Sequence, residues 1–414
     1  MPLAEGVQAS IRYKPYASGA ITPNSQPLLS VEPGASGGQL LRRTASTLNL
    51  RKDTYRSAEI RADRQVGDMR HGTRRVEGSI SGEWSPATYA ELIAAAHRHS
   101  PVPALSHDDT DFTSLAADAA SSTLILAGGD PVAEGYRLGD VIRLGGLATM
   151  DNAGRNFLIT GFSGTANRTI SVTPAPVTMV ADSSFTITRP GEVSFVPASG
   201  HVSRKFLVEV FSEDIDLSRL FTECRITGYR LSLPASGMAT IEVMAMGRDM
   251  QTLSGGAAPF LASPAGITST GILAAVNGAL YVSGARLGVV TALDVEFTLA
   301  AEAPAVVGQD FVPEIMLGTA RVSGRVSALL QDASLIDAFT DEAEGSILML
   351  LEAGTAQPAD AVGLYLPRIK FGQADVQLSG EGPQLVSLTF EALRYLGSVP
   401  GIESTTIRLH DTAA

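Results

Sequence analysis

The chain has 414 residues, of which 44% are hydrophobic and 18% charged, enough for about two to four domains with apolar cores. Its net charge of −12 argues against a DNA-binding role, because affinity for the DNA backbone depends on Lys and Arg that neutralise phosphates. A single cysteine, Cys224, excludes an intrachain disulfide and a cysteine-rich metal site. No apolar run is long enough for a membrane-spanning helix, and the first residues lack the apolar stretch of a secretion signal.

The first hundred residues predict an arm, an exposed loop, a strand and a helix, in that order. Residues 1–40 are rich in Ser, Pro and Gly, and we expect an extended arm that is disordered unless it lies on a neighbour. Residues 51–75 mix basic and acidic side chains and are expected to form a long exposed loop. Polar and apolar residues alternate over 75–83, which predicts a strand with one buried face. Ser85 and Pro86 then have the residue types of a helix start. The apolar stripe of that helix would be Tyr89, Leu92, Ile93 and Ala96.

Residues 101–200 differ from the preceding part because short strand candidates follow one another closely. Gly, Asn, Asp and Pro separate these candidates, as in a small barrel or sandwich. The predicted strands are Thr123–Leu126, Val141–Leu144, Phe157–Thr160, Thr169–Val172 and Ser184–Thr188.

The rest of the chain predicts two hairpins, each with one apolar and one polar face. The first hairpin joins Arg225–Leu233 to Ala239–Met246, and the second joins Asp375–Leu378 to Leu385–Phe390. Further strands are expected at Lys205–Phe211, Gly278–Val282, Val290–Thr298, Arg321–Ala328 and Ile347–Leu351. Asp332 has the residue type of an N-cap for a short helix bearing Leu335, Ala338 and Phe339.

Two parts of the sequence can be superimposed, which indicates an internal duplication. Residues 75–81 match 321–327, 246 positions later, and the helix that follows keeps this offset. Arg225 and Ile226 match Arg368 and Ile369, 143 positions later. The difference between the two offsets is about the length of the 101–200 segment, so we infer that a small domain is inserted in the first copy.

The predicted fold is therefore mainly β, with two related β domains, each flanked by a helix, and an inserted small β-barrel. The expected map is an extended arm (1–40), a discontinuous first domain (41–100 and 201–260), an insertion (101–200), a second domain (261–400) and a C-terminal tail (401–414).

Three segments carry a family resemblance: Thr47–Tyr55, the strand and helix start at 74–89, and the hairpin at 221–246. They resemble the major tail tube proteins of long-tailed, non-contractile bacteriophages. The resemblance covers residues 40–100 and 201–250 well and 275–395 more loosely. It rests on patterns of residue types rather than on a catalytic motif.

The resemblance implies a β-sandwich or barrel with a flanking helix, and a virion protein that self-assembles into stacked rings around a channel for the genome. Two tube domains per chain imply homotrimeric rings of pseudo-sixfold symmetry, with a hexamer as the alternative. The implied partners are further copies of the chain and the tail terminator, tape measure and distal tail proteins. The implied location is the virion tail after synthesis in the host cytoplasm, with no membrane involved. The 101–200 segment departs from the family pattern and is expected to project outward.

The resemblance also suggests functional surfaces. The polar hairpin faces would line the channel, and their acidic side chains Glu242, Asp375 and Glu391 are candidates to face DNA, which passes without specific binding because carboxylates repel phosphates. Ordinary exposed strand carboxylates are the alternative interpretation. The 51–75 loop would contact the next ring, with a plain solvated loop as the alternative. The candidate contact residues are Arg51, Arg56, Arg61, Arg64, Arg70 and Arg74.

No residue pattern indicates an enzyme, a cofactor or a metal site. His97 and His99 are two positions apart and point to different sides of a helix, so they cannot share a metal ion well. Asp108, Asp109 and Asp111 lack the Gly and distal Glu of a calcium loop. Cys224 is predicted to be a buried apolar thiol in a strand.

Two other functions remain open from the sequence. The first is another ring-forming phage protein, such as a head–tail joining, tail terminator or baseplate protein, which would not polymerise. The second is a carbohydrate-binding or adhesive β module based on residues 101–200, although aromatic residues make up only 6% of the chain.

Overall fold

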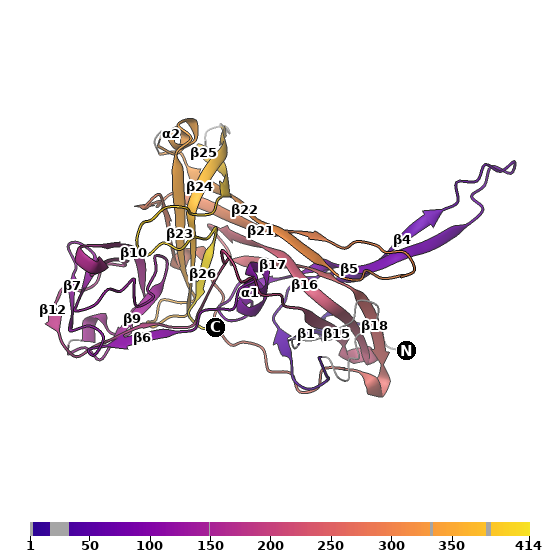
Figure 1. Cartoon of the computed structure of the whole chain (residues 1–414), viewed down its shortest axis with the longest axis horizontal. Coiled ribbons are helices and arrows are strands. Elements are labelled where there is room, and N and C mark those ends of the chain that lie inside the picture. The colour runs from indigo at the N-terminus through magenta and orange to yellow at the C-terminus, as the bar shows by residue number, and fades with distance from the viewer. Residues whose placement is uncertain (1–2, 17–32, 149, 332–333, 378–381) are drawn as a thin grey trace.

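The computed structural model describes residues 3–16, 33–148, 150–331, 334–377 and 382–414. The protein is mainly β, and its two sheets are built from antiparallel strand pairs. A large sheet runs through the middle of the molecule, a smaller sheet lies at one end, and the hairpin of β4 and β5 projects from the other end (Figure 1). The mainly β class predicted from the sequence is confirmed.

The large sheet contains eighteen strands that come from almost the whole chain. Their bounds are β1 (Ala9–Pro15), β2 (Gln39–Leu41), β3 (Ala45–Ser46), β4 (Asn49–Arg56), β5 (Met69–Glu83), β14 (Glu192–Phe195), β15 (Phe206–Ser212), β16 (Leu217–Pro234), β17 (Thr240–Gly247), β18 (Asp249–Ser254), β19 (Gly278–Val282), β20 (Ala285–Arg286), β21 (Val290–Glu302), β22 (Met316–Leu329), β23 (Glu344–Glu352), β24 (Ala361–Gln377), β25 (Leu385–Ala392) and β26 (Arg408–Asp411).

The smaller sheet is formed by the inserted segment and is open. Its eight strands lie in the order β12-β7-β8-β11-β10-β9-β13-β6, with β12 and β6 at the two edges. The sequence-based prediction of a closed barrel is therefore wrong: short strands with many turns are equally compatible with an open sheet, and only the edge pairing distinguishes the two. The five strands predicted between 101 and 200 are present. The bounds are β6 (Leu105–Asp108), β7 (Ser114–Asp118), β8 (Thr123–Ala127), β9 (Val141–Gly145), β10 (Phe157–Ser163), β11 (Thr169–Thr173), β12 (Met179–Asp182) and β13 (Thr186–Arg189).

Helix α1 (Ala90–His97) covers the apolar face of the first half. It begins at Ala90 rather than at Pro86, because Ala87 has a left-handed backbone (φ +64°) that interrupts the helix. Its predicted apolar stripe is buried. At its end, His97 contacts the Tyr229 hydroxyl through Nε2 (2.7 Å) and the Ser194 hydroxyl through Nδ1 (2.8 Å), which fixes α1 on β16 and β14.

Helix α2 (Ser334–Thr340) packs against β24 in the second half. Phe339, part of its predicted stripe, is partly buried against Val386 and Leu388. The predicted cap Asp332 and the hairpin residue Leu378 lie outside the described residues. Short 3₁₀ turns occur at Gly6–Gln8, Met150–Asn152, Thr165–Asn167, Glu213–Ile215, Gly255–Ala257 and Ala275–Asn277.

The two halves of the chain pair their strands in the same order. In the first half, β5 pairs with β17, β17 with β16, β16 with β15 and β15 with β1. In the second half, β22 pairs with β25, β25 with β24, β24 with β23 and β23 with β19. Each half also carries a hairpin that leads into this arrangement, β4–β5 and β21–β22. The strand order therefore repeats.

The repeat includes both ends of the chain, which differs from the map expected from the sequence. Residues 9–15, placed in the arm, form β1 between β15 and β2, and Ile11 is buried. Residues 408–411, placed in the tail, form β26, which pairs with β24 as β18 pairs with β16. Both segments are too short to show a reliable pattern, and their pairing partners are distant in the sequence. Strand β14, placed in the insertion, pairs with β26 and belongs to the large sheet.

The paired residues define which positions of the two halves are equivalent. Gly78 opposes Ala245 in the first half, and Gly324 opposes Phe390 in the second. The offset of 246 from the sequence is thus kept for β5 and β22, whereas β16 and β24 correspond with an offset of 145 rather than 143, since Ile226 opposes Ala245 as Phe371 opposes Phe390. The correction of two residues leaves every side chain on the same face.

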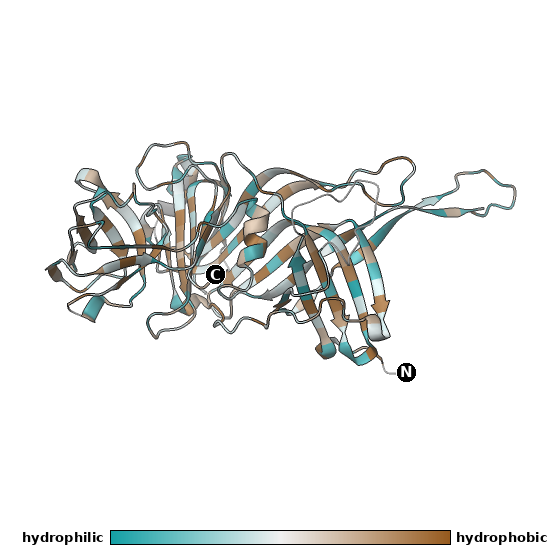
Figure 2. Ribbon diagram, turned by 60° about the horizontal axis from the view of Figure 1, so that its bottom comes forward, coloured by the Kyte–Doolittle hydropathy of each residue, from teal (hydrophilic) through white to brown (hydrophobic). Residues whose placement is uncertain are grey.

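One apolar core runs under both halves of the large sheet. Buried side chains of both halves, such as Ile80, Tyr229, Phe297 and Val326, belong to the same cluster. The side chains between them point to the opposite, polar face, and the resulting alternation is visible along the strands in Figure 2. The inserted sheet has a separate core around Phe157.

Substitution of Gly78 and Gly324 tests the repeat, because the two glycines occupy equivalent positions and neither has room for a Cβ atom. A methyl group on Gly78 would lie 2.6 Å from the Thr47 carbonyl oxygen, and one on Gly324 would overlap the Asp294 carbonyl oxygen and the Phe390 ring. We expect Gly78→Ala and Gly324→Ala each to lower the free energy of unfolding by about 1–3 kcal/mol, measured by thermal or urea unfolding. Gly266→Ala, with no atom within 4 Å of the added methyl, is the control, and equal stability of all three variants would contradict the prediction.

Candidate assembly surfaces

The polar face of the large sheet extends across both halves of the chain. In one continuous row, Ser81 opposes Glu242, Glu242 opposes Arg230, and Arg230 opposes Glu296; the row continues through Ser323 to Glu391. This face carries charges of both signs. Its carboxylates include Glu77, Glu83, Glu242, Asp294, Glu296, Asp375 and Glu391, and its cations include Arg75, Arg225, Arg230, Arg321, Arg325 and Lys370.

The three side chains predicted to face a channel all lie on this polar face. Glu242 is 3.8 Å from Arg230, whose guanidinium also pairs with Glu296 at 3.0 Å. Glu391 is exposed and opposes Lys370. Asp375 is exposed near the end of β24, beside Gln373. The register thus brings Glu242 and Glu391 into one row, with Asp375 in a separate row.

Several strands of the large sheet pair on one side only among the described residues, and β24 and β3–β4 are among them. Residues 371–377 of β24 pair with β25 on one side only. Strands β3 and β4 pair with β5 on one side only. An unpaired edge presents a row of backbone donors and acceptors, and it is therefore a template for pairing with another chain.

The predicted long loop is a projecting hairpin. Residues 49–56 and 69–83 form β4 and β5, which leaves only residues 57–68 as the loop. The sequence indicated only residues 75–83 of these strands, because both faces of the projecting part are largely exposed and polar and the usual alternation is absent there.

The arginines predicted as contact residues of this hairpin have different surroundings. Arg61 and Arg70 pair locally with Asp63 (3.1 Å) and Asp68 (3.0 Å). Arg74 pairs with Asp249 (3.0 Å) and Asp310 (3.4 Å) within the same chain. The remaining three make no ion pair with any described residue; they are Arg51, Arg56 and Arg64.

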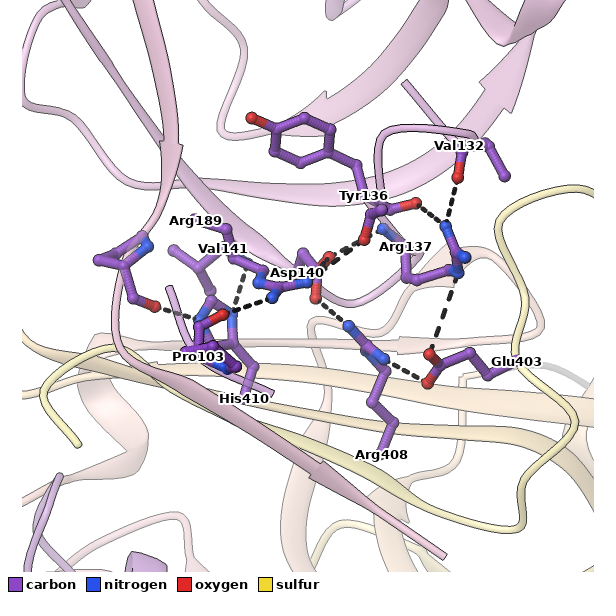
Figure 3. Close-up of polar contacts among 12 residues, drawn as sticks. Pro103, Val132, Tyr136, Arg137, Asp140, Val141, Arg189, Glu403, Arg408 and His410 are labelled. Carbon is purple, nitrogen blue, oxygen red and sulfur yellow. Dashed lines mark hydrogen bonds and ion pairs between the residues drawn. The ribbon is translucent and has the colours of Figure 1, made fainter. Parts of the chain in front are cut away.

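A buried ionic cluster joins the inserted sheet to the C-terminal strand β26 (Figure 3). Asp140, which is fully buried, accepts a hydrogen bond from Arg408 (2.5 Å) and lies 3.6 Å from Arg189. Arg408 also pairs with Glu403. Since Asp140 and Arg189 belong to the insertion and Arg408 to β26, these contacts hold the two sheets in a fixed relation.

His410 makes a second connection in the same place. Its Nδ1 accepts from the backbone N–H of Val141 (2.9 Å), and its Nε2 donates to the Pro190 carbonyl (2.7 Å). This pattern requires the neutral ring, and burial lowers the pKa of His410 to about 4. Burial would raise the pKa of Asp140, but the positive charges of Arg408 and Arg189 hold it below its usual range. The carboxylate is therefore ionised at neutral pH.

The two histidines and the cysteine considered in the sequence analysis are packed against other side chains. His97 is buried and hydrogen-bonded, and His99 stacks near Phe195 with ring centroids 4.1 Å apart. Cys224 is completely buried, as predicted, and burial raises the pKa of its thiol. Within the described ranges there is no cluster of His, Cys, Asp or Glu suited to a metal ion, and no helix there is long and apolar enough to cross a membrane.

The sequence analysis did not identify the ionic cluster. Its members are far apart in the sequence, and isolated Asp, Arg and His residues give no signal of burial.

These surfaces define a β protein that presents two sheet edges, a continuous polar face and a projecting hairpin to other molecules. A family model described as phage tail tube protein matches residues 6–392. The chain belongs to the phage tail tube protein family. It is accordingly a non-enzymatic structural component of the virion tail that self-assembles into a tube. A search of curated proteins gave no match.

The ionic cluster predicts that replacing Asp140 by the similarly shaped Asn strongly lowers the stability of the fold. Asp140→Asn removes the charge that compensates the buried Arg189 and Arg408, and breaking a buried ion pair from one side costs about 3–5 kcal/mol. We expect a clearly lower melting temperature by differential scanning calorimetry. Asp109→Asn changes an exposed carboxyl in the same insertion and should leave the melting temperature unchanged. Similar values for both variants would refute the role of the cluster.

Proposed function

We propose that this chain forms the tail tube as homotrimeric rings, in which two tube domains per chain give pseudo-sixfold symmetry. The tube domains are residues 41–100 with 201–260, and residues 261–400, with β1 and β26 completing them. The observation that carries this proposal is the join between the two halves: residues 228–234 of β16 pair with β21. One domain thus already extends the sheet of the other through its edges.

The repeat supports closure of the ring by the same join between chains. With the offset of 145, residues 373–377 of β24 correspond to 228–232 of β16; β3 and β4 correspond to β21. Strands β16 and β21 are paired within the chain, whereas their counterparts have unpaired edges. A contact between β24 of one copy and β3–β4 of the next is head-to-tail, and such contacts form a ring when the rotation from copy to copy closes.

The exposure of equivalent side chains supports the same contact. Leu231 of β16 is 3% exposed, and its counterpart Val376 of β24 is 40% exposed. In the register of the intrachain join, Val376 would lie opposite Leu48, and Asp375 opposite Asn49 with Arg51 diagonal to it. The neighbour would therefore cover Val376 and supply a cation near Asp375.

The polar face would line the channel in such a ring. Its carboxylates, with Glu242, Asp375 and Glu391 among them, support a surface along which DNA moves, because they repel its phosphates. The opposite face is covered by α1 and the core. The insertion, residues 101–200, would project outward.

The hairpin loop supports contacts beyond one ring, because it extends far from the body of the chain (Figure 1). We assign a contact with the next ring to Arg61 in its exposed tip. At the ends of the tube, the tail terminator and distal tail proteins would bind the same surfaces, and the tape measure protein would occupy the channel before DNA.

Electron microscopy of the purified protein at high concentration tests the proposal. We expect rings or tubes with a central hole, and class averages of end-on views should show threefold symmetry with six similar inner lobes. Compact monomers under all conditions, or a ring without threefold symmetry, would overturn the proposed assembly.

The join between copies predicts a charge-swap effect. Asp375→Arg and Arg51→Asp should each raise the protein concentration needed for assembly about tenfold, which corresponds to about 1.4 kcal/mol per contact. The double variant should recover most of the loss because it restores an opposite-charge pair across the edge. Sedimentation measures assembly, and Arg56→Asp on the same strand is the control. Additive losses in the double variant would contradict the proposed register.

A further inference from the structure

The loop between β21 and β22 lies in a groove of the first half of the chain. Arg74 forms a parallel β-bridge with Phe311, and its N–H donates to the Asp310 carbonyl at 2.8 Å. Arg248 donates to the Val312 carbonyl at 3.1 Å and stacks over the Phe311 ring. The loop therefore fits between β5 and the segment that joins β17 to β18.

Apolar and charged contacts hold this loop in place. Val312 and Ile315 are 0% and 2% exposed. Between them, Glu314 pairs with Arg225 at 2.5 Å and with Lys205 at 3.1 Å. The loop thus inserts two apolar side chains and one carboxylate into the first half.

The equivalent position in the second half is an open groove of about 930 Å³. By the offset of 246, Arg74 is equivalent to Ala320, and by the offset of 145, Arg248 is equivalent to Leu393. Ala320 and Leu393 both line this groove. It lies between β22 and the segment after β25, as the occupied groove lies between β5 and the segment after β17. No described segment of the chain fills it.

The loop equivalent to 303–315 is the loop of the projecting hairpin, residues 57–68. With the offset of 246 that relates β5 to β22, Val66, Asp68 and Met69 correspond to Val312, Glu314 and Ile315. Each residue type is kept, as two apolar side chains flank a carboxylate. Yet Val66 and Met69 are 65% and 50% exposed, because the hairpin points away from its own chain.

We propose that the β4–β5 hairpin of each copy docks in this groove of the neighbouring copy, with Val66 and Met69 buried there. This proposal rests on the ring proposed above. The neighbour would be the copy whose β24 edge pairs with β3 and β4, since β21 and its loop contact one and the same half within the chain. The tip of the hairpin stays outside, as Val306 and Val307 of the docked loop are 40% and 104% exposed.

The charges of the second half suit this occupant. Arg225, which binds Glu314, corresponds to Lys370, and the adjacent Arg368 lies on the same strand. Asp68 would therefore meet cations, which now pair with Glu344. Arg64 takes the place of Asp310, and the groove lining includes the carboxylates of Glu296 and Glu391.

A designed disulfide tests the docking directly. Gln65 and Ala320 correspond to Phe311 and Arg74, whose backbones are bridged within the chain. After oxidation of assembled Gln65→Cys/Ala320→Cys protein, a denaturing gel should show covalent dimers and trimers and nothing larger. Each single variant should remain monomeric, because the native Cys224 is buried.

The outcomes separate the docking from the ring itself. Rings seen by electron microscopy without covalent dimers or trimers would overturn the docking alone. A ladder beyond trimers would place the loop in another ring and would also overturn it. Absence of rings for the wild-type protein would overturn the proposed assembly, and the docking with it.

A matched pair of loop variants gives a second test. Val66→Asp places a carboxylate in the apolar part of the groove and should raise the concentration needed for assembly at least about tenfold. Ile60→Asp changes a side chain in the same loop that is fully exposed, and assembly should stay within about twofold of wild type. Both residues are exposed in the single chain, so the monomer's melting temperature should not change. Equal effects of the two variants would contradict the docking.

Discussion

The pairing of β16 with β21 is the interaction on which the organisation of this protein depends. A strand edge in a sheet carries unpaired backbone N–H and C=O groups, and it must be covered, paired or blocked by charge. Here one edge of the first half is paired by the second half of the same chain. The strand order then leaves the corresponding edges, β24 and β3–β4, at opposite ends of the repeat. A repeat that joins to its own copy once within the chain has the geometry to do so again between chains.

The two faces of the large sheet differ in composition. The apolar face contributes to a single core that both halves share, so the halves cannot move independently without exposing it. The polar face has no such constraint and carries charges of both signs.

The insertion is attached both by buried charges and by an apolar cluster, in which Val141 and Leu158 pack with side chains of β23 and β24. Asp140, Arg189 and Arg408 are almost inaccessible to water, and charges in this position are stable only when each has its partner. Such a cluster gives a defined orientation, because the pairs are satisfied in one arrangement of the two sheets. It also explains why β26, the last strand, is integral to the fold: it supplies Arg408 and His410 and pairs with both β14 and β24.

Local patterns in the sequence determined the strands of the two hairpins, the apolar stripe of α1 and the order of elements that reveals the duplication. Alternation with period two records which face is buried, and this information is contained in neighbouring residues. The sequence did not reveal the strands β1 and β26, the open edges of the inserted sheet, or the projecting part of the β4–β5 hairpin. Strands β1 and β26 depend on partners far away in the chain, and the projecting part of the hairpin has no buried face to create a pattern. The ionic cluster likewise exists only where three distant segments meet. Tertiary structure alone decided which edges are paired and which are open. The pairing of an edge depends on two strands together, and the sequence of either strand does not specify its partner.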